Sequence, residues 1–320
     1  MSGHPSRPGA RIGALLLAAL LALGAAAPAA AVAPPPYPVL DPTQPPFLVQ
    51  RFPLPDLPWG ALYPHDRSIA PVRGDPPTDA DGIPMRSEHG RLVYTPTGIA
   101  FQGLRRLDAW VRTGDPAYGA AMVAWAFKLR SLLVRDGATL WAPIPWDSPD
   151  QGLTSPWYNA LAQGTALAFF VRLARITGDA RWMRVADGLF RGFLVLGPGP
   201  GPWVGHVPDG RYLWLEHYVR GRRGAVLNAH LYAALGLRDY WQATRSPLAR
   251  LLTEAAFTTI RAEGERFRRP GTWSWYNLVD QVAHRSYHDF HIRLLRAAAV
   301  ASGDPWFDGL ADRLLEDYVP

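Results

Sequence analysis

Apolar residues recur at helical spacing along most of the chain after residue 89. The segments 159–176 and 228–243 show this most clearly, with apolar side chains at intervals of three and four residues. Four short turns interrupt the pattern. Gly in these turns supplies the left-handed conformation that ends a helix, and Asp or Ser, often followed by Pro, begins the next helix. The turns lie at 112–118, 176–182, 243–249 and 301–307, and they predict four helical hairpins.

The turns are evenly spaced along the chain. Thr113, Thr177, Thr244 and Ser302 mark corresponding positions, and the intervals between them are 64, 67 and 58 residues. An interval of this length accommodates two helices and an insertion. Such repeats predict an all-α fold, an (α/α) barrel or toroid of about four helical hairpins, with irregular or short β insertions lining a cleft at one end. An open solenoid of stacked hairpins is the alternative.

Three insertions precede the second, third and fourth hairpins. They occupy residues 140–159, 201–228 and 271–287. Because all three belong to the same end of the repeat, we expect them to meet on one face of the domain. Within the second insertion, residues 211–218 follow a Pro-Asp-Gly turn and are typical of a strand.

The chain before the first hairpin divides into two parts. Residues 1–33 combine Arg7 and Arg11 with an apolar run and small residues, which is the layout of an export signal, or of an uncleaved N-terminal anchor. We therefore expect an exported protein, secreted or in the cell envelope, with no other membrane segment. Residues 34–88 are Pro-rich and predict an extended arm with little regular structure, which leaves 89–320 as the toroid domain.

Composition narrows the chemistry further. The chain has no Cys, so thiol catalysis and Cys-ligated metals are excluded. The formal charge is +6, and removal of 1–33 takes away two Arg and no acid, leaving +4. That charge is compatible with a polyanionic partner. Thirteen Trp are present; such rings can stack on sugars, although most indoles fill cores.

Residues 271–292 concentrate phenols and imidazoles. His284, His288 and His291 are spaced to share one face of a helix, and three imidazoles can bind zinc. No clear fourth ligand follows, so hydrogen-bonded histidines are the favoured interpretation, and we predict neither a metal nor another cofactor. Carboxylate pairs drawn from Glu216, Asp280 and Asp289 would instead favour a glycoside hydrolase.

A third interpretation uses phenols as acid and base. Tyr287 lies one turn before His291, and such a pair suits removal of a weakly acidic proton, such as the proton at C5 of a sugar acid. Groups on opposite faces of the ring would remove the proton from one side and return it on the other. Taken singly, each of Tyr218, Tyr276 and Tyr287 is better explained by ordinary aromatic packing.

An ordered set of motifs carries a family resemblance. From about Asp81 to the C-terminus the chain resembles the C-terminal domain of the D-glucuronyl C5-epimerases, which convert D-glucuronate to L-iduronate in heparosan-type chains. The motifs are SPWYNALAQGTAL (155–167), WLEHY (214–218), AVLNAHLYAALGLRDYW (225–241), TWSWYNL (272–278) and YHDFHIRLL (287–295). The resemblance implies an (α/α) barrel and an epimerase that needs no cofactor. The implied partner is an anionic polysaccharide rather than nucleic acid, and a homodimer is left open.

The resemblance also implies which residues act. The catalytic set becomes Tyr287, Tyr218 and Tyr276 with His217 and Glu216. Substrate-binding residues would be Tyr94, a looser match, together with Trp157, Tyr158, Gln163, Asn228, His288 and His291. Trp273 or Trp275 would stack on the sugar.

The sequence departs from the family at the catalytic glutamate. The family has two consecutive Glu before the first tyrosine, and the second is the catalytic one, whereas His217 holds that place here. Three outcomes are open: His217 is the opposing base, Glu216 swings in, or activity is lost. A change of one residue along a strand reverses the side chain's direction, so Glu216 is not a simple substitute.

A second departure concerns substrate charge. The family carries Arg-His after Tyr-Asp-Leu, and Val279 and Asp280 follow here. The replacement cation would come from one of Arg220, Arg222, Arg223 and Arg285. The alternatives to an epimerase are a polysaccharide lyase or glycoside hydrolase on a uronate-containing glycan, or an inactive glycan-binding homologue.

Overall fold

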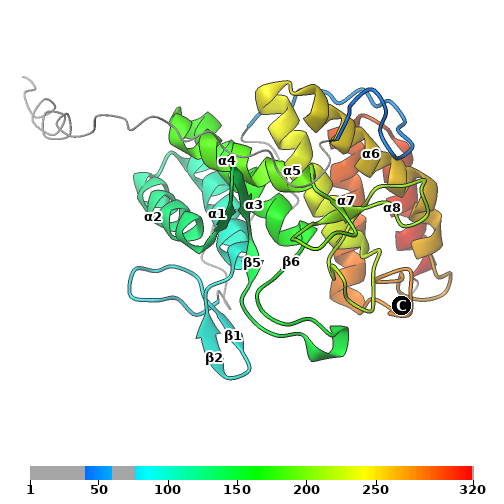
Figure 1. Cartoon of the computed structure of the whole chain (residues 1–320), viewed down its shortest axis with the longest axis horizontal. Coiled ribbons are helices and arrows are strands. Elements are labelled where there is room, and N and C mark those ends of the chain that lie inside the picture. Colours follow the sequence, from blue (N-terminus) through cyan, green and yellow to red (C-terminus); the bar gives the residue numbers. More distant parts are fainter. Residues whose placement is uncertain (1–39, 60–75, 319–320) are drawn as a thin grey trace, which may run out of the picture. The chain divides into compact units, whose positions relative to one another are not determined.

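Four helical hairpins make up most of the domain. The computed structural model describes residues 40–59 and 76–318; the predicted export signal and parts of the Pro-rich arm lie outside these ranges. The hairpins, shown in Figure 1, are α1 (Pro96–Thr113) with α2 (Pro116–Leu132), α3 (Ala160–Thr177) with α4 (Ala180–Phe193), α5 (Leu227–Thr244) with α6 (Pro247–Glu263), and α7 (Arg285–Ser302) with α8 (Trp306–Asp317). No helix in these ranges is long and apolar enough to cross a bilayer.

The turns end and restart the helices as predicted. Gly114 follows α1 with φ 70°, a left-handed conformation that glycine adopts without steric cost. The side chain of Asp115 then accepts a hydrogen bond from the backbone of Ala117, which caps α2. The third turn has no Gly, and Arg245 takes the left-handed position with φ 57°. Local chemistry therefore accounts for the hairpins.

The hairpins pack side by side to form the predicted toroid. Helices α1, α3, α5 and α7 form the inner row, in which each packs on the next, and α2, α4, α6 and α8 each cover their own partner outside it. The α3 and α5 backbones approach closely, because a Cβ on Gly164 would lie 2.5 Å from the Cα of Ala233. In the described part of the chain, α1 and α7 make no extended contact with each other, so the row is open between them.

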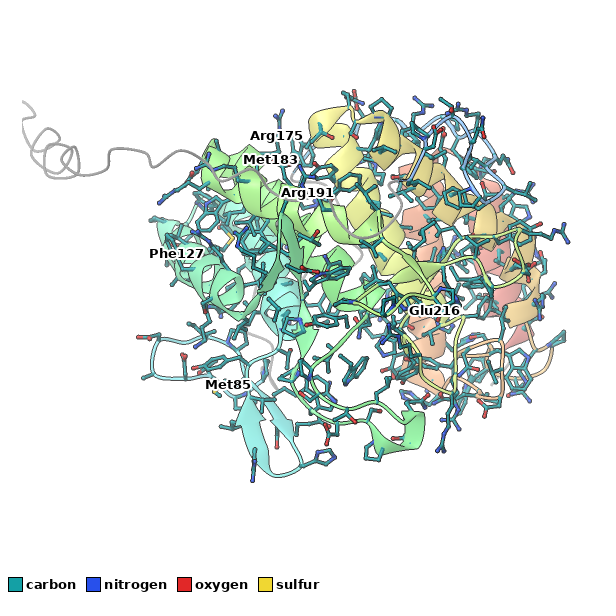
Figure 2. The ribbon with its side chains drawn as sticks, in the orientation of Figure 1. Met85, Phe127, Arg175, Met183, Arg191 and Glu216 are labelled. Carbon is teal, nitrogen blue, oxygen red and sulfur yellow. The ribbon has the colours of Figure 1, made fainter. Side chains whose placement is uncertain are left out.

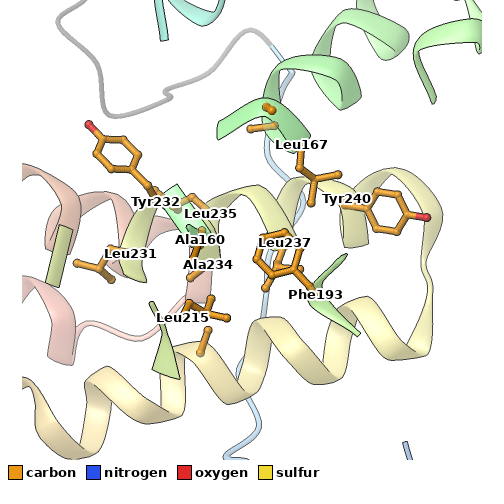
Figure 3. Close-up of a cluster of buried hydrophobic side chains, with 14 of the residues drawn as sticks. Ala160, Leu167, Phe193, Leu215, Leu231, Tyr232, Ala234, Leu235, Leu237 and Tyr240 are labelled. Atoms are coloured by element: carbon orange, nitrogen blue, oxygen red, sulfur yellow. The ribbon is translucent and has the colours of Figure 1, made fainter. Parts of the chain in front are cut away.

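The core lies between the inner and outer helices. Leu167 of α3, Leu237 of α5 and Phe193 of α4 belong to one buried cluster (Figure 3). Tyr240 stacks on Phe190 with ring centroids 4.3 Å apart. Burial of these apolar and aromatic side chains stabilises the row by the hydrophobic effect.

The strands are short and lie outside the helices. They form the pairs β1 (Arg86–Glu88) with β2 (Arg91–Val93), β3 (Val134–Asp136) with β4 (Thr139–Trp141), β5 (Pro143–Ile144) with β6 (Trp157–Tyr158), and the sheet β7 (Leu196–Gly197), β8 (Gly205–His206), β9 (Trp214–Leu215). Single 3₁₀ turns occupy Pro149–Gln151 and Gly264–Phe267. The strand predicted over 211–218 is thus only two residues long, because the chain turns at Tyr218–Gly221.

Residues 40–59 of the Pro-rich arm contain no regular structure and lie against the helices. The Leu54 amide donates to the carbonyl of Ser302 at 3.0 Å, and the Phe52 ring packs on Phe257 at 5.8 Å. Arg51 pairs with the buried carboxylate of Glu254 at 2.7 Å. These contacts fix the arm to α6 and α7.

Candidate active site

A cavity of about 1000 Å³ occupies the opening between α1 and α7. Residues from both helices form its sides, and Asn228 and Tyr232 of α5 also line it. All three insertions reach it, through Trp157, His217 and Tyr276 among others. The prediction that the insertions meet on one face is confirmed.

A row of aromatic side chains runs along the cavity wall. The ring of His217 lies 6.3 Å from Trp157 and 4.4 Å from Tyr218, measured between centroids. The Tyr218 and Tyr276 phenols lie close enough to influence each other's pKa. Tyr276 in turn contacts Tyr287 with centroids 4.9 Å apart. The row therefore places His217 and Tyr287 on either side of a phenol pair.

Glu216 holds the loop that presents His217. Its amide donates to the carbonyl of Val204 at 2.8 Å, which continues the sheet. Glu216 is 5% exposed, and its carboxylate pairs with His206 Nε2 at 2.8 Å and accepts from the Ala225 amide at 3.0 Å. Glu216 lies among the loops before α5 (Figure 2) and does not line the cavity. Consecutive side chains of an extended segment point in opposite directions, so His217 faces the cavity instead.

Two other contacts position the tyrosines. The carbonyl of Tyr276 accepts from the Leu227 amide at 3.3 Å, which ties the third insertion to the start of α5. Tyr287 lies in the first turn of α7, and His284 is the capping residue that precedes it. The first turn of α7 therefore carries the phenol at the edge of the third insertion.

The polar atoms of the row have unequal surroundings. Burial lowers the pKa of His217 to about 4, so its imidazole is neutral at pH 7. Burial raises the pKa values of Tyr218 and Tyr276, which stay protonated. Within 40–59 and 76–318, Nδ1 of His217 is buried without a hydrogen-bond partner. Asn228 Oδ1 is likewise buried without a partner. Buried polar groups are normally paired, so these atoms are suited to a ligand.

Several predicted site residues lie behind the cavity wall. Gln163 is fully buried, and its side chain bonds the backbone of Leu140, Ala142 and Leu189. Tyr158 packs against the core and does not line the cavity, whereas Trp157 does. These side chains hold the insertion in place, which a sequence motif alone does not distinguish from substrate contact.

Tyr94 and two indoles also point elsewhere. The Tyr94 hydroxyl donates to Asp79 at 2.6 Å, and the ammonium of Lys128 lies 3.6 Å from its ring centroid. Trp273 packs near Tyr318, and Trp275 lies under the guanidinium of Arg269. Neither indole lines the cavity, where Trp146 and Trp157 are found instead.

His288 and His291 form a buried pair around Ser274. The Nδ1 of His288 accepts from the Ser274 amide at 3.0 Å, and the Nδ1 of His291 lies 2.9 Å from the Ser274 hydroxyl. His291 stacks on Tyr276 from behind, with centroids 6.5 Å apart. No group of three potential ligands for a metal occurs among the described side chains. The pair supports the phenol row rather than lining the cavity.

The cations of the cavity differ from those expected. Arg223 pairs with Asp280 at 2.8 Å, and Arg220 donates to the carbonyls of Gly199 and Gly201. The arginines that line the cavity are Arg86, Arg105 and Arg293. In the sequence, polar and aromatic residues recur at helical spacing over 101–105 in α1 and 287–293 in α7. This pattern could have indicated the arginines that line the cavity.

One protein family matches more than half of this chain. Residues 144–316 match the family described as D-glucuronyl C5-epimerase C-terminus. Two solved structures of unsaturated glucuronyl hydrolase from Streptococcus agalactiae, one of them a mutant, are similar at 16% identity with TM-scores of 0.41 and 0.40. The alignments cover 70% and 69% of this chain and 59% of each hydrolase chain, so this chain spans about three fifths of their length.

Proposed function

We propose, since this chain belongs to the D-glucuronyl C5-epimerase C-terminal family, that it is an epimerase acting at C5 of D-glucuronate residues in a polysaccharide, which it converts to L-iduronate. The observation that carries the proposal is the aromatic row. His217 and Tyr287 line one cavity, Nδ1 of His217 is buried without a hydrogen-bond partner within the described ranges, and the Tyr218–Tyr276 pair lies between them.

The first step is removal of the C5 proton. This proton is weakly acidic because it is alpha to the carboxylate, and its loss places negative charge on the carboxylate oxygens. His217 is the base in this proposal, since its pKa of about 4 keeps the ring unprotonated at neutral pH. A base of such low pKa needs strong stabilisation of the enolate. The Glu216 carboxylate is already bound to His206 and the Ala225 amide, so it is not the base.

The second step returns a proton to the opposite face. Tyr287 supplies it from the other end of the row, and the configuration at C5 is inverted. The site then holds protonated His217 and a Tyr287 phenolate. Because a phenolate is a much stronger base than imidazole, proton return is downhill. The Tyr218 and Tyr276 phenols lie between the two ends of the row.

The carboxylate arrangement does not favour a glycoside hydrolase. Such an enzyme needs two carboxyl groups that flank the scissile bond. Among the described residues that line the cavity, Glu88 is the only acidic one, and it pairs with Arg86 at 2.7 Å. Asp150 is close enough to raise the pKa of Tyr218 but does not line the cavity. Proton removal and return need no redox cofactor, and the proposal includes none.

The substrate and its location follow from the same proposal. An anionic polysaccharide outside the membrane fits the net positive charge and the predicted export signal. Trp146 and Trp157 offer indole surfaces in the cavity for sugar rings.

Hydrogen exchange tests the proposal directly. The purified full-length chain is incubated with heparosan in D₂O, and NMR follows deuterium at C5 and the appearance of iduronate. Deuterium at C5 together with iduronate supports the epimerase. Exchange accompanied by unsaturated ends indicates a lyase, and binding without exchange indicates an inactive homologue.

A further inference from the structure

The three arginines that line the cavity have different partners. Arg86 pairs with Glu88 at 2.7 Å, and Arg105 Nη1 donates to Gln102 at 3.1 Å. Arg293 pairs with no carboxylate anywhere in 40–59 or 76–318. An exposed cation at the cavity wall without an acidic partner can bind an anion at no cost in broken ion pairs.

The side chain of Arg293 extends along the cavity. Its guanidinium lies over the ring of Phe290, 4.5 Å from the centroid, and that ring lies 6.4 Å from the ring of Tyr287. Helical side chains lean toward the N-terminus of their helix, and Arg293 accordingly leans back along α7 over Phe290, one turn before it. Its positive charge also acts on Tyr232 of α5. Burial raises the pKa of that phenol, and the charge of Arg293 partly offsets the rise.

The substrate carries its charge next to the reacting carbon. In a uronate the carboxylate is bonded to C5, so a cation that binds it lies beside the acid and base groups that act there. The same cation stabilises the charge that develops on the carboxylate oxygens when the proton leaves. The third insertion offers Val279 and Asp280 at the positions where the family resemblance expects Arg-His, and Arg223 is already paired with Asp280.

We propose that Arg293 binds the carboxylate of the reacting uronate and is the specificity-determining cation of this site; the inference rests on the proposed function. A guanidinium offers two parallel N–H donors that match the two carboxylate oxygens. Stacking on Phe290 orients this fork before substrate arrives, which reduces the entropy lost on binding.

The test compares four proteins and two ligands. The proteins are the wild type, Arg293→Gln, Arg293→Lys and the control Arg296→Gln, which alters an exposed arginine of the same helix that pairs with Asp312 at 2.7 Å. The ligands are a heparosan oligosaccharide and its carboxyl-reduced counterpart, in which glucose replaces each uronate. Calorimetry gives Kd, and C5 deuterium incorporation gives kcat and KM. Circular dichroism confirms that each variant is folded.

The wild type is expected to prefer the uronate oligosaccharide. Arg293→Gln should weaken its binding about 10- to 100-fold, the loss typical of one charge-assisted pair, and leave affinity for the reduced chain unchanged. Arg293→Lys should be intermediate, and Arg296→Gln should match the wild type. An unchanged preference in Arg293→Gln, or no preference in the wild type, overturns the inference. If the wild type shows no C5 exchange but prefers the uronate oligosaccharide, and Arg293→Gln removes this preference, the proposed epimerase activity is wrong and the proposed carboxylate site is supported.

Discussion

The most informative perturbation separates the two neighbours Glu216 and His217. The two side chains have different surroundings, since the Glu216 carboxylate is buried in contacts with His206 and Ala225 while His217 lines the cavity. The variants Glu216→Gln and His217→Gln change one side chain each with little change in volume. We expect the first to lose stability and the second to lose activity.

The expected magnitudes come from the contacts. In Glu216→Gln one acceptor oxygen remains, while the amide nitrogen faces either His206 Nε2 or the Ala225 amide, so one charge-assisted hydrogen bond is lost. That loss is worth about 1.5–3 kcal/mol of unfolding free energy, which lowers Tm by about 3–10 °C in a domain of this size. Nδ1 of His217 has no hydrogen bond to lose within the described chain, so the stability effect of His217→Gln should stay below about 1 kcal/mol.

The activity assay is C5 deuterium incorporation into heparosan, measured alongside urea unfolding of the same preparations. Removal of a general base lowers the rate about 10²- to 10⁴-fold, and this is the loss expected for His217→Gln. Glu216→Gln should retain the rate within a few-fold below its Tm. Loss of exchange in Glu216→Gln with unchanged unfolding free energy would refute the assignment, because the carboxylate would then act on substrate.

Three further results are expected. Tyr287→Phe should lower C5 exchange about 10²- to 10⁴-fold with unchanged oligosaccharide Kd, because only the proton donor is removed; a parallel loss of affinity in calorimetry would contradict this. Asp239→Asn should lower the free energy of unfolding in urea by about 3–5 kcal/mol, because buried Arg172 loses a two-point pair at 2.5 and 3.1 Å. The exposed control Asp312→Asn should lower it by less than about 1 kcal/mol, and equal losses in the two variants would contradict this expectation. Burial lowers the pKa of His230 from 6.5 to about 4. As the pH falls through this range, the unfolded chain binds a proton that the folded chain does not, so His230 should lower the free energy of unfolding by about 2–3 kcal/mol. Unfolding free energies that stay constant from pH 7 to pH 4 would rule this out.

The hairpins were predictable because their determinants are local. The sequence around Gly114 and Asp115 carries the left-handed cap and the side-chain acceptor, and both act within one turn of the helix. The direction of His217 relative to Glu216 was predictable for a similar reason, since alternation along an extended segment involves adjacent residues only. The strand over 211–218 was predicted too long. The observed strand β9 has only two residues, and the chain turns at Tyr218.

Some of the predicted site residues lie behind the cavity wall, because a sequence motif does not show which way a side chain points. Gln163 and His291 lie within the motifs that carry the family resemblance, yet one bonds the backbone of the first insertion and the other supports Tyr276 from behind. Arg293 was missed for the converse reason. Helical spacing shows that it shares a side of α7 with Phe290, but only the packing of α7 determines that this side faces the cavity.

The sequence by itself therefore determined the helical hairpins, their order and the ends at which the insertions meet, because caps, turns and apolar periodicity act over a few residues. Only the tertiary structure decided what the cavity contains. It opens between α1 and α7, which both line the cavity although they are distant along the chain. A polar side chain such as Glu216 either forms hydrogen bonds within the protein or stays free to bind a ligand, and this depends on partners from other segments of the chain. A local sequence pattern contains no information on those distant partners.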